Sequence, residues 1–480
     1  MPLRSFVAVL TLIACSPGAR AQAVSDSLFT EDAVRADLTA LYETLREAHY
    51  DLYAHTSRQA YDARYHEALA EIDGPHTRLD VVRLLMPFVA FGNVGHARID
   101  FPIPDYVPYV MGGGTLLPFD VRIEADRVLV AYSYTAAVRP GDELITLDDR
   151  PASAWVERLG SYLSAERPIM RDAQLESFFP RLFWLDQGRA DAFQVTIRPE
   201  GAGVDTTFTL AAADALAAEQ AKAEWEAAPR ERAATVLPDG VAYLRPGPFY
   251  AADEGESLAT FEAFVDDAFR QFVESGASDL VLDLRDNPGG DNSFSDPILA
   301  WVADRPFRFA SDYRVRASAE TRRVLAGLAD DVPDGVSDGV SAQMLDAMRE
   351  REDGERFAFE IPEVAPRTDS TFGGRVWALV NRHSYSNAAS VAAIVQDYGF
   401  GVVLGEETSD LPTSYASSAQ FTLPHTGVVV TYPKGYFVRP SGDEAVRGVV
   451  PDVPIRRPAV PTDEDAVLEA TVEHVLSQRP

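Results

Sequence analysis

The stretch that decides the fold runs from Leu280 to Asp291 and reads LVLDLRDNPGGD. Its first residues form a short apolar run of the kind found in a strand buried on both faces of a parallel sheet. The Asn-Pro-Gly-Gly sequence that follows ends the strand and leaves backbone N–H groups uncovered by side chains, a shape suited to binding an oxyanion. A strand that ends in such a loop predicts an α/β domain with a ligand site at the carboxyl edge of its sheet.

A second stretch repeats this order of elements, from Val376 to Ala389, and reads VWALVNRHSYSNAA. An apolar strand is followed by a polar loop, and Ser386 stands at the first turn of a predicted helix over residues 386–398. The free N–H groups and the dipole of a helix N-terminus favour negative charge at that place. Taken alone, each loop has an ordinary structural explanation: the first is a tight turn, and the second supplies a serine as helix N-cap. Together at one sheet edge they predict a functional site.

Other apolar runs at 241–244 and 402–404 complete the pattern, with helical periodicity at 258–275 between strands, as βαβ crossovers require. A polar insertion occupies roughly 314–367. We therefore expect an α/β catalytic domain over residues 229–460 and a C-terminal helix over 461–480.

The chain before residue 229 divides into two further parts. Amphipathic spacing predicts helices over 31–49, 57–72 and 79–91, which make a helical N-terminal module over 24–104 that ends with the loop carrying His96. Residues 105–228 are rich in β patterns, and we expect strands at 119–123, 127–131 and 193–197 and a helical connector at 211–228. The predicted fold class is α+β multidomain.

Composition and missing motifs narrow the chemistry. The formal net charge of −31 over 480 residues argues against nucleic acid or anionic membrane surfaces as partners. The sequence has no HExxH, no Cys/His cluster and no GxxxxGK or GxGxxG loop, so we expect neither a metal nor a nucleotide cofactor. It also has no GxSxG, which argues against the nucleophile elbow of α/β-hydrolases.

The first residues are typical of an export signal. Arg4 precedes a short apolar run at 6–14 and a small-residue cleavage site near Ala21, which predicts a signal peptide over 1–23. The apolar run is too short to span a bilayer, and no later run is long enough, so no transmembrane helix is expected. Cys15, the single cysteine, also fits a lipobox. The sequence leaves two outcomes open: a periplasmic or secreted protein, or an outer-membrane lipoprotein with a lipid anchor at Cys15.

The motifs at 282–290 and 380–389, with Gly-Glu-Glu-Thr at 405–408 and Gly-Val-Val-Pro-Asp at 448–452, resemble those of the tail-specific (C-terminal processing) serine peptidases. The branch most similar to this chain includes the tricorn core protease and retinoid-binding relatives. The resemblance implies a serine peptidase with Ser386 as nucleophile, a peptide or protein substrate and no cofactor. The segment 139–148 is similar to a strand of PDZ domains, so the resemblance implies a PDZ-like module over 105–228.

Two catalytic styles occur in that family, and the sequence favours one of them. Processing proteases activate the serine with a lysine whose place corresponds to Leu411 here, and no lysine lies between Lys222 and Lys434. The tricorn-like branch uses a histidine from an earlier Gly-His element, which matches Gly95-His96. A histidine with a near-neutral pKa is also the group that chemistry would choose to take a proton from a serine.

The remaining site residues follow from the resemblance. Glu444 precedes the 448–452 element and would orient the histidine, although it stands one residue away from the family spacing and an ordinary loop glutamate is the alternative. The backbone N–H groups of Gly289 or Gly290 and of Asn387 would hold the oxyanion.

The sequence thus predicts an exported serine peptidase that forms an acyl-enzyme on Ser386. Two alternatives remain open at this point. The same fold serves non-enzymatic carriers of hydrophobic ligands or peptides, because a fold does not determine an activity. A small-molecule esterase could use the same pair of residues.

Overall fold

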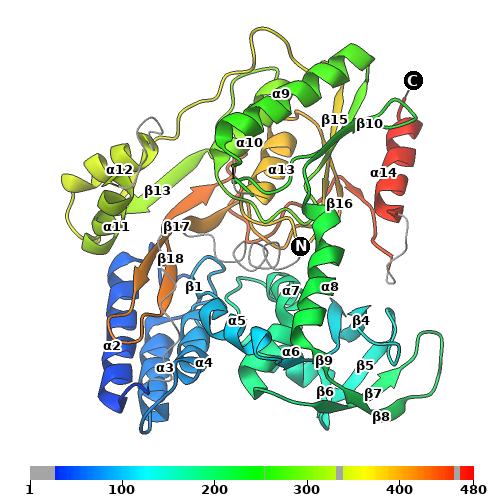
Figure 1. The fold of residues 1–480 in the computed structure, drawn as a ribbon. Helices are drawn as coiled ribbons and strands as arrows, with labels where there is room; N and C mark the ends of the chain where they lie inside the picture. The colour runs from blue at the N-terminus through cyan, green and yellow to red at the C-terminus, as the bar shows by residue number, and fades with distance from the viewer. Residues whose placement is uncertain (1–27, 253–254, 331–338, 459–464, 480) are drawn as a thin grey trace.

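The computed structural model describes residues 28–252, 255–330, 339–458 and 465–479, which fold into three parts that meet near the centre of the molecule (Figure 1). The predicted signal peptide and Cys15 lie outside the described residues. Within the ranges described, none of the helices combines the length and the apolar character needed to cross a bilayer.

The N-terminal part is helical, as the periodicity predicts. It contains α2 (Glu31–Ala48), α3 (Arg58–Glu71) and α4 (Arg78–Ala90). Each helix has a hydroxyl residue at its N-cap, and the hydroxyl oxygen accepts a hydrogen bond from a backbone N–H of the first turn. These N-cap residues are Thr30, Ser57 and Thr77. After α4 the chain turns through residues 91–97 into the short strand β1 (Arg98–Ile99). This loop carries His96.

The middle part is a sheet with helices packed on it. Its elements are α5 (Ile103–Met111), β2 (Thr115–Leu116), β3 (Phe119–Glu124), β4 (Arg127–Ser133), β5 (Glu143–Leu147), β6 (Arg150–Pro151), α6 (Ala152–Gly160), α7 (Pro168–Gln187), β7 (Ala192–Arg198), β8 (Thr206–Ala211), β9 (Ala213–Asp214) and α8 (Ala215–Arg230). The main sheet is antiparallel in the order β3-β4-β5-β7-β8, with β6 beside β5. Helix α8 leads from it to the catalytic part (Figure 1).

Helix α7 is the main element that the sequence pattern did not predict. Its buried residues lie all around the helix, among them Met170, Phe179 and Leu185, because α7 is covered on several sides. A helix buried all around has no polar face, so it lacks the amphipathic stripe by which helices are recognised. Pro180 inside the helix weakens the local pattern further.

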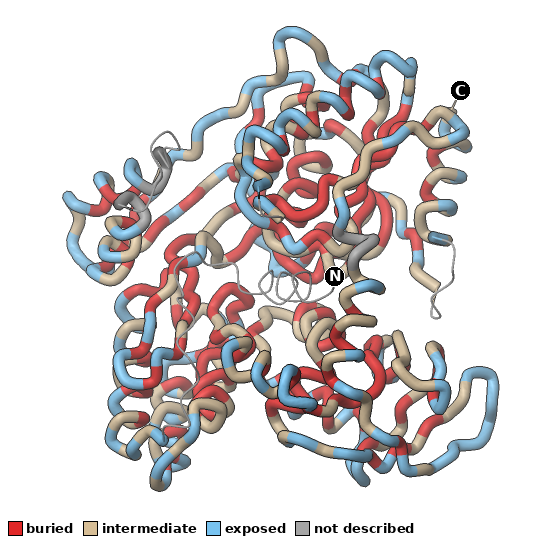
Figure 2. Tube along the Cα trace, viewed as in Figure 1, coloured by how far each residue is buried: buried red, intermediate tan, exposed pale blue. Residues whose placement is uncertain are grey.

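The catalytic part is built on a parallel sheet. Its strands are β10 (Ala233–Val236), β11 (Ala242–Arg245), β12 (Asp279–Asp283), β15 (Arg375–Val380), β16 (Val402–Gly405) and β19 (Val453–Pro454), adjacent in that order and parallel except for β10 with β11. Three helices pack on one face, α9 (Leu258–Ser275), α10 (Asn292–Val302) and α13 (Asn387–Asp397), and α14 (Ala466–Ser477) packs on the other. Figure 2 shows this sheet and α13 as a buried centre.

Strands β12 and β15 are neighbours, with Asp283 opposite Leu379. Because the two strands are parallel, the loops that follow them leave from the same edge of the sheet, as the sequence predicts. The loop at 284–291 and the loop at 381–386 are therefore close in space.

A second sheet joins the catalytic part to the N-terminal helices. It contains β13 (Asp312–Arg316), β14 (Arg356–Ala358), β17 (Ser414–Thr422) and β18 (Val429–Val438), and the insertion adds α11 (Ala319–Asp330) and α12 (Gly339–Arg349). Strand β1 pairs with β18, with Arg98 opposite Thr431. Phe421 and Tyr432 share a hydrophobic core with α2. The hairpin that the linear pattern assigns to the catalytic domain thus also forms part of the core of the N-terminal part.

Candidate active site

Ser386 stands between β15 and α13 in a strained backbone conformation. Its φ is 52° and its ψ is −120°, values that a residue with a side chain rarely adopts. Although it occupies the N-cap position of α13, its side chain makes no capping hydrogen bond. The residue is half-buried. A hydroxyl that is presented by a sharp strand-to-helix turn and does not cap the helix is arranged like an enzyme nucleophile.

The neighbouring Ser384 has a different role. It is fully buried, its Oγ donates to the carbonyl of Leu284 at 2.8 Å, and the same Oγ accepts the N–H of Asn381 at 3.0 Å. The Tyr385 N–H donates to the carbonyl of Asn287 at 2.9 Å. These bonds tie the two predicted loops together, so the hydroxyl of Ser384 is used in holding the site, whereas the half-buried hydroxyl of Ser386 makes no capping bond.

Gly289 brings the first loop against Ser386. A Cβ at this position would lie 2.8 Å from the Cβ of Ser386, and the φ of Gly289 is +85°, so only glycine fits. Its N–H donates to the Oδ1 of Asn287 at 2.8 Å. Among the described residues, the N–H groups of Gly290 and Asn387 have no acceptor. Of the three predicted oxyanion donors, these two are therefore available in this structure.

His96 lies beside the nucleophile loop. Its ring stacks on Tyr385, with 5.4 Å between ring centroids, and the Tyr385 hydroxyl donates to the carbonyl of Gly95 at 3.4 Å across 290 residues of sequence. The side chain is buried, and neither ring nitrogen has a hydrogen-bond partner among the described residues. The fold thus brings together the two segments that the sequence singled out for base and nucleophile.

Burial keeps the imidazole of His96 neutral. It lowers the pKa of His96 below the ordinary value of 6.5, and the nearby carboxyl of Asp410 opposes this shift without reversing it. A neutral imidazole at pH 7 can accept a proton, which is the state that a general base requires.

Asp410 is the site residue that sequence reasoning missed. Its Oδ2 lies 3.9 Å from Nε2 of His96 and accepts the N–H of Ser386 at 2.6 Å, and the side chain is 1% exposed. Burial raises the pKa of Asp410, while His96 and the N–H of Ser386 oppose the shift. The sequence held one signal for this residue, since Asp410 precedes Leu411, the place that corresponds to the lysine of the processing proteases.

Glu444 lies apart from this group. It is exposed, and its Oε2 accepts the hydroxyl of Tyr436 at 3.4 Å. Within the described part of the chain, no hydrogen bond or ion pair joins Glu444 to His96. The carboxylate that faces the imidazole in this structure is that of Asp410.

Lys434 is bonded to a different serine. Its Nζ donates to the Oγ of Ser417 at 2.7 Å and to the carbonyl of Ser417 at 3.1 Å. It stands on β18, where the register of the hairpin brings it opposite Ser417 of β17, whose φ is 59°. This arrangement fixes the hairpin through a lysine that is itself buried.

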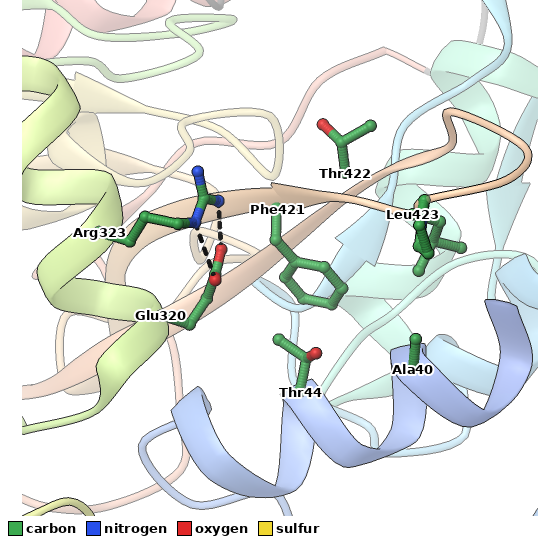
Figure 3. Close-up of a pocket in the computed structure, with 8 residues that line it drawn as sticks. Ala40, Thr44, Glu320, Arg323, Phe421, Thr422 and Leu423 are labelled. Atoms are coloured by element: carbon green, nitrogen blue, oxygen red, sulfur yellow. Dashed lines mark hydrogen bonds and ion pairs between the residues drawn. The ribbon is translucent and has the colours of Figure 1, made fainter. Parts of the chain in front are cut away.

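No cluster of His, Cys, Asp and Glu in the described ranges has the arrangement of a metal site. A surface pocket of about 290 Å³ lies between α2, α11 and β17, where Thr44, Phe421 and the ion pair of Glu320 with Arg323 line it (Figure 3). None of its lining residues belongs to the group around Ser386.

One protein-family model matches the part of the chain that carries Ser386. Residues 241–455, which hold Ser386, Asp410 and the glycine loop, match the sequence model of peptidase family S41. The chain contains a peptidase family S41 domain. Among curated proteins, none matches the sequence significantly.

Solved structures extend the likeness beyond the S41 domain. Mature CPAF complexed with lactacystin superposes with a TM-score of 0.65 at 15% identity and covers 93% of this chain and 97% of its own. Mature CPAF alone gives 0.62 at 15% identity, covering 93% and 96%. The photosystem II D1 C-terminal processing protease gives 0.43 at 16% identity, covering 91% and 96%. At such identities the CPAF structures show a shared fold, and with the S41 domain they support a serine-type peptidase.

Proposed function

We propose that this S41 peptidase cleaves peptide bonds through an acyl-enzyme on Ser386, with His96 as general base. The observation that carries the proposal is the stacking of His96 on Tyr385, the residue directly before Ser386. This contact brings a buried neutral imidazole to the strained serine. The structure has no hydrogen bond between the two side chains, and such bonds often form only when substrate binds.

The proposed reaction has two halves. His96 accepts the proton of the Ser386 hydroxyl as Oγ attacks the carbonyl carbon of the peptide bond. The N–H groups of Gly290 and Asn387 bind the oxyanion, and each is expected to contribute about 10²–10³-fold to kcat. His96 then gives its proton to the leaving amine as the C–N bond breaks. Water attacks the acyl-enzyme with His96 again as base, which releases the acid and restores Ser386.

Asp410 is our candidate for the third member. Its carboxylate faces Nε2 of His96, so its charge would stabilise the imidazolium that forms during each half reaction. The same carboxylate holds the N–H of Ser386 and so fixes the strained backbone of the nucleophile. Glu444, which the resemblance implies, remains the second candidate.

The proposal includes two points from the sequence. Export would use the segment 1–23, and the antiparallel module over 105–228 would be PDZ-like and bind an extended peptide by strand addition.

Labelling with a fluorophosphonate probe, followed by mapping of the modified residue, tests the proposal. We expect the probe on Ser386 in the wild type, no label in Ser386→Ala and retained label in Ser384→Ala. If the folded wild-type protein takes up no label, the result would instead support the alternative of a non-enzymatic carrier of hydrophobic ligands or peptides. Cleavage of small esters without cleavage of any peptide would support the esterase.

A further inference from the structure

The backbone on both sides of His96 is held by the middle part of the molecule. Glu166, in the loop between α6 and α7, accepts the N–H of Gly95 on its Oε1 at 3.0 Å. Ser164, which is buried, donates its hydroxyl to the carbonyl of Ala97. The residue before His96 and the residue after it are therefore both bonded to one short loop of another module.

The contact is close as well as hydrogen-bonded. A Cβ on Gly95 would lie 2.6 Å from the Sδ of Met170 and 2.9 Å from Oε2 of Glu166. The loop that carries His96 thus packs directly against the side chains of Glu166 and Met170, and a side chain on Gly95 would have to displace them. A change in the packing of these two side chains would therefore act on the backbone beside His96.

The same segment also reaches the nucleophile loop. Glu176 in α7 lies 3.0 Å from Nε2 of His383 through its Oε2 and 3.2 Å from Nη1 of Arg382 through its Oε1. It also accepts the N–H of Ile123 at 2.7 Å, which fixes it to its own sheet. Burial would raise the pKa of Glu176, but the bonds from His383 and Arg382 outweigh it and hold that pKa below its ordinary value. The carboxylate of Glu176 is therefore charged where it contacts the loop that carries Ser386.

A third contact reaches the loop between β16 and β17, which carries Asp410, the proposed third member. Arg167 pairs with Glu407, three residues before Asp410, and Glu407 in turn accepts the N–H of Gly448 at 3.0 Å. Residues 164–176, which we name the bridging segment, therefore touch all three chain segments that supply the site.

We propose that Ser164, Glu166 and Glu176 are positioning residues, through which the bridging segment sets the geometry of His96 relative to Ser386. The inference rests on the proposed function for the roles of those two residues. Its physical basis is that the imidazole of His96 has no hydrogen-bond partner in the part of the chain that the structure describes, so its position depends on its backbone and on the stack with Tyr385. A misplacement of the order of 1 Å can cost about 10²-fold in rate.

Glu166 gives the sharpest test because its two oxygens differ. Oε1 holds Gly95, while Oε2 is buried without a partner among the described residues. Glu166→Gln keeps an acceptor for the N–H of Gly95, and Glu166→Ala removes it. We expect Glu166→Ala to lower kcat by about 10- to 100-fold with KM changed by less than about threefold, and Glu166→Gln to restore kcat to within about threefold of the wild type.

A matched control separates positioning from loss of the module's stability. Glu219 is a buried carboxylate of the same module that bonds Arg181 and Tyr106, and among the described residues it has no hydrogen bond or ion pair with the loops of Ser386, His96 or Asp410. Glu219→Gln, measured at a temperature where it is folded, should keep kcat near that of the wild type. Glu176→Gln should lower kcat as Glu166→Ala does, since it loses the charge that pairs with Arg382 and His383.

Hydrogen exchange of the peptide covering residues 92–100 tests, without an activity measurement, whether Glu166 and Ser164 hold the backbone beside His96. We call these two bonds the clamp. We expect faster exchange there in Glu166→Ala and wild-type exchange in Glu166→Gln. Equal exchange in Glu166→Ala and the wild type, or a wild-type kcat in Glu166→Ala, would overturn the proposal. An equal loss of kcat in Glu219→Gln would do the same. Absence of fluorophosphonate label on wild-type Ser386 would reject the proposed function instead, and the exchange result would still decide whether the clamp exists.

Discussion

The loop that carries Ser386 and the loop that carries His96 are held in different ways. The first has bonds inside its own domain, where Ser384 bonds Leu284 and Tyr385 bonds Asn287, and Glu176 of the middle part adds contacts to it through Arg382 and His383. The second is clamped on both sides of the histidine by Ser164 and Glu166 of another module, and its imidazole makes no hydrogen bond.

The difference shows which contacts position Ser386 and which contacts position His96. A strand, a polar turn and a helix give Ser386 its local backbone conformation, with the two loops side by side because their parallel strands are neighbours. His96 reaches the same place only when three parts of the chain have packed together. Reactivity of the serine and productive alignment of the histidine should therefore be separable by mutation.

The largest expected effect contrasts the two serines of the nucleophile loop. Ser386→Ala should abolish turnover, a loss of about 10⁴-fold or more in kcat, and leave the melting temperature nearly unchanged. Ser384→Ala should keep measurable activity and lose stability by about 1–3 kcal/mol, because it removes the acceptor of the buried Asn381 N–H and one of the donors to the Leu284 carbonyl. Steady-state kinetics and denaturant unfolding of both variants check this. The reverse pattern would mean that Ser384 is the nucleophile.

Removing the imidazole of His96 should lower kcat about as much as removing the hydroxyl of Ser386. His96→Ala should cost nearly as much in kcat as Ser386→Ala, and the double variant should be hardly worse than either, because members of one catalytic unit are strongly non-additive. Lys434→Ala is the control, since that side chain bonds Ser417, and it should keep kcat within a small factor. A near-normal kcat in His96→Ala, or a collapse in Lys434→Ala, would reject histidine as the base.

A smaller effect on kcat should show whether Asp410 or Glu444 is the third catalytic residue, beside Ser386 and His96. Asp410→Asn keeps the shape but removes the charge that faces Nε2 of His96, so we expect kcat to fall by about 10²–10⁴-fold. Glu444→Gln should change kcat by less than about tenfold, because Glu444 is exposed and bonds Tyr436. Measuring both variants with one peptide substrate decides between them. A larger loss in Glu444→Gln would restore the assignment that the resemblance implies.

The smallest effect is a displacement of the acid limb of the pH profile. A general base acts when it is neutral, so kcat/KM should fall as the pH drops through the pKa of His96. Because burial lowers that pKa below 6.5, the midpoint should lie below that of an ordinary histidine. A midpoint near 7 would point to Glu166, whose pKa burial raises to about 7, and such a midpoint should then vanish in Glu166→Gln.

Much of the fold could be predicted because its signals are local. The amphipathic spacing of α2 and the apolar runs of β12 and β15 appear directly in the sequence, as do the Gly-Gly loop and the serine turn. Helix α7 was missed because burial on several sides removes its polar face. The pairing of β1 with β18 was missed because nothing in either strand marks a partner more than 300 residues away.

The sequence by itself determined which chemistry is available: a serine at a strand-to-helix turn, a glycine loop beside it and a Gly-His element without a suitable lysine. Only the tertiary structure decided how these groups meet. It placed Asp410, instead of Glu444, 3.9 Å from His96, and it bonded the backbone on both sides of His96 to Ser164 and Glu166. The physical reason is that residue type and backbone propensity act over a few neighbours, whereas burial, charge pairing and the position of an unbonded imidazole depend on contacts between segments far apart in the chain.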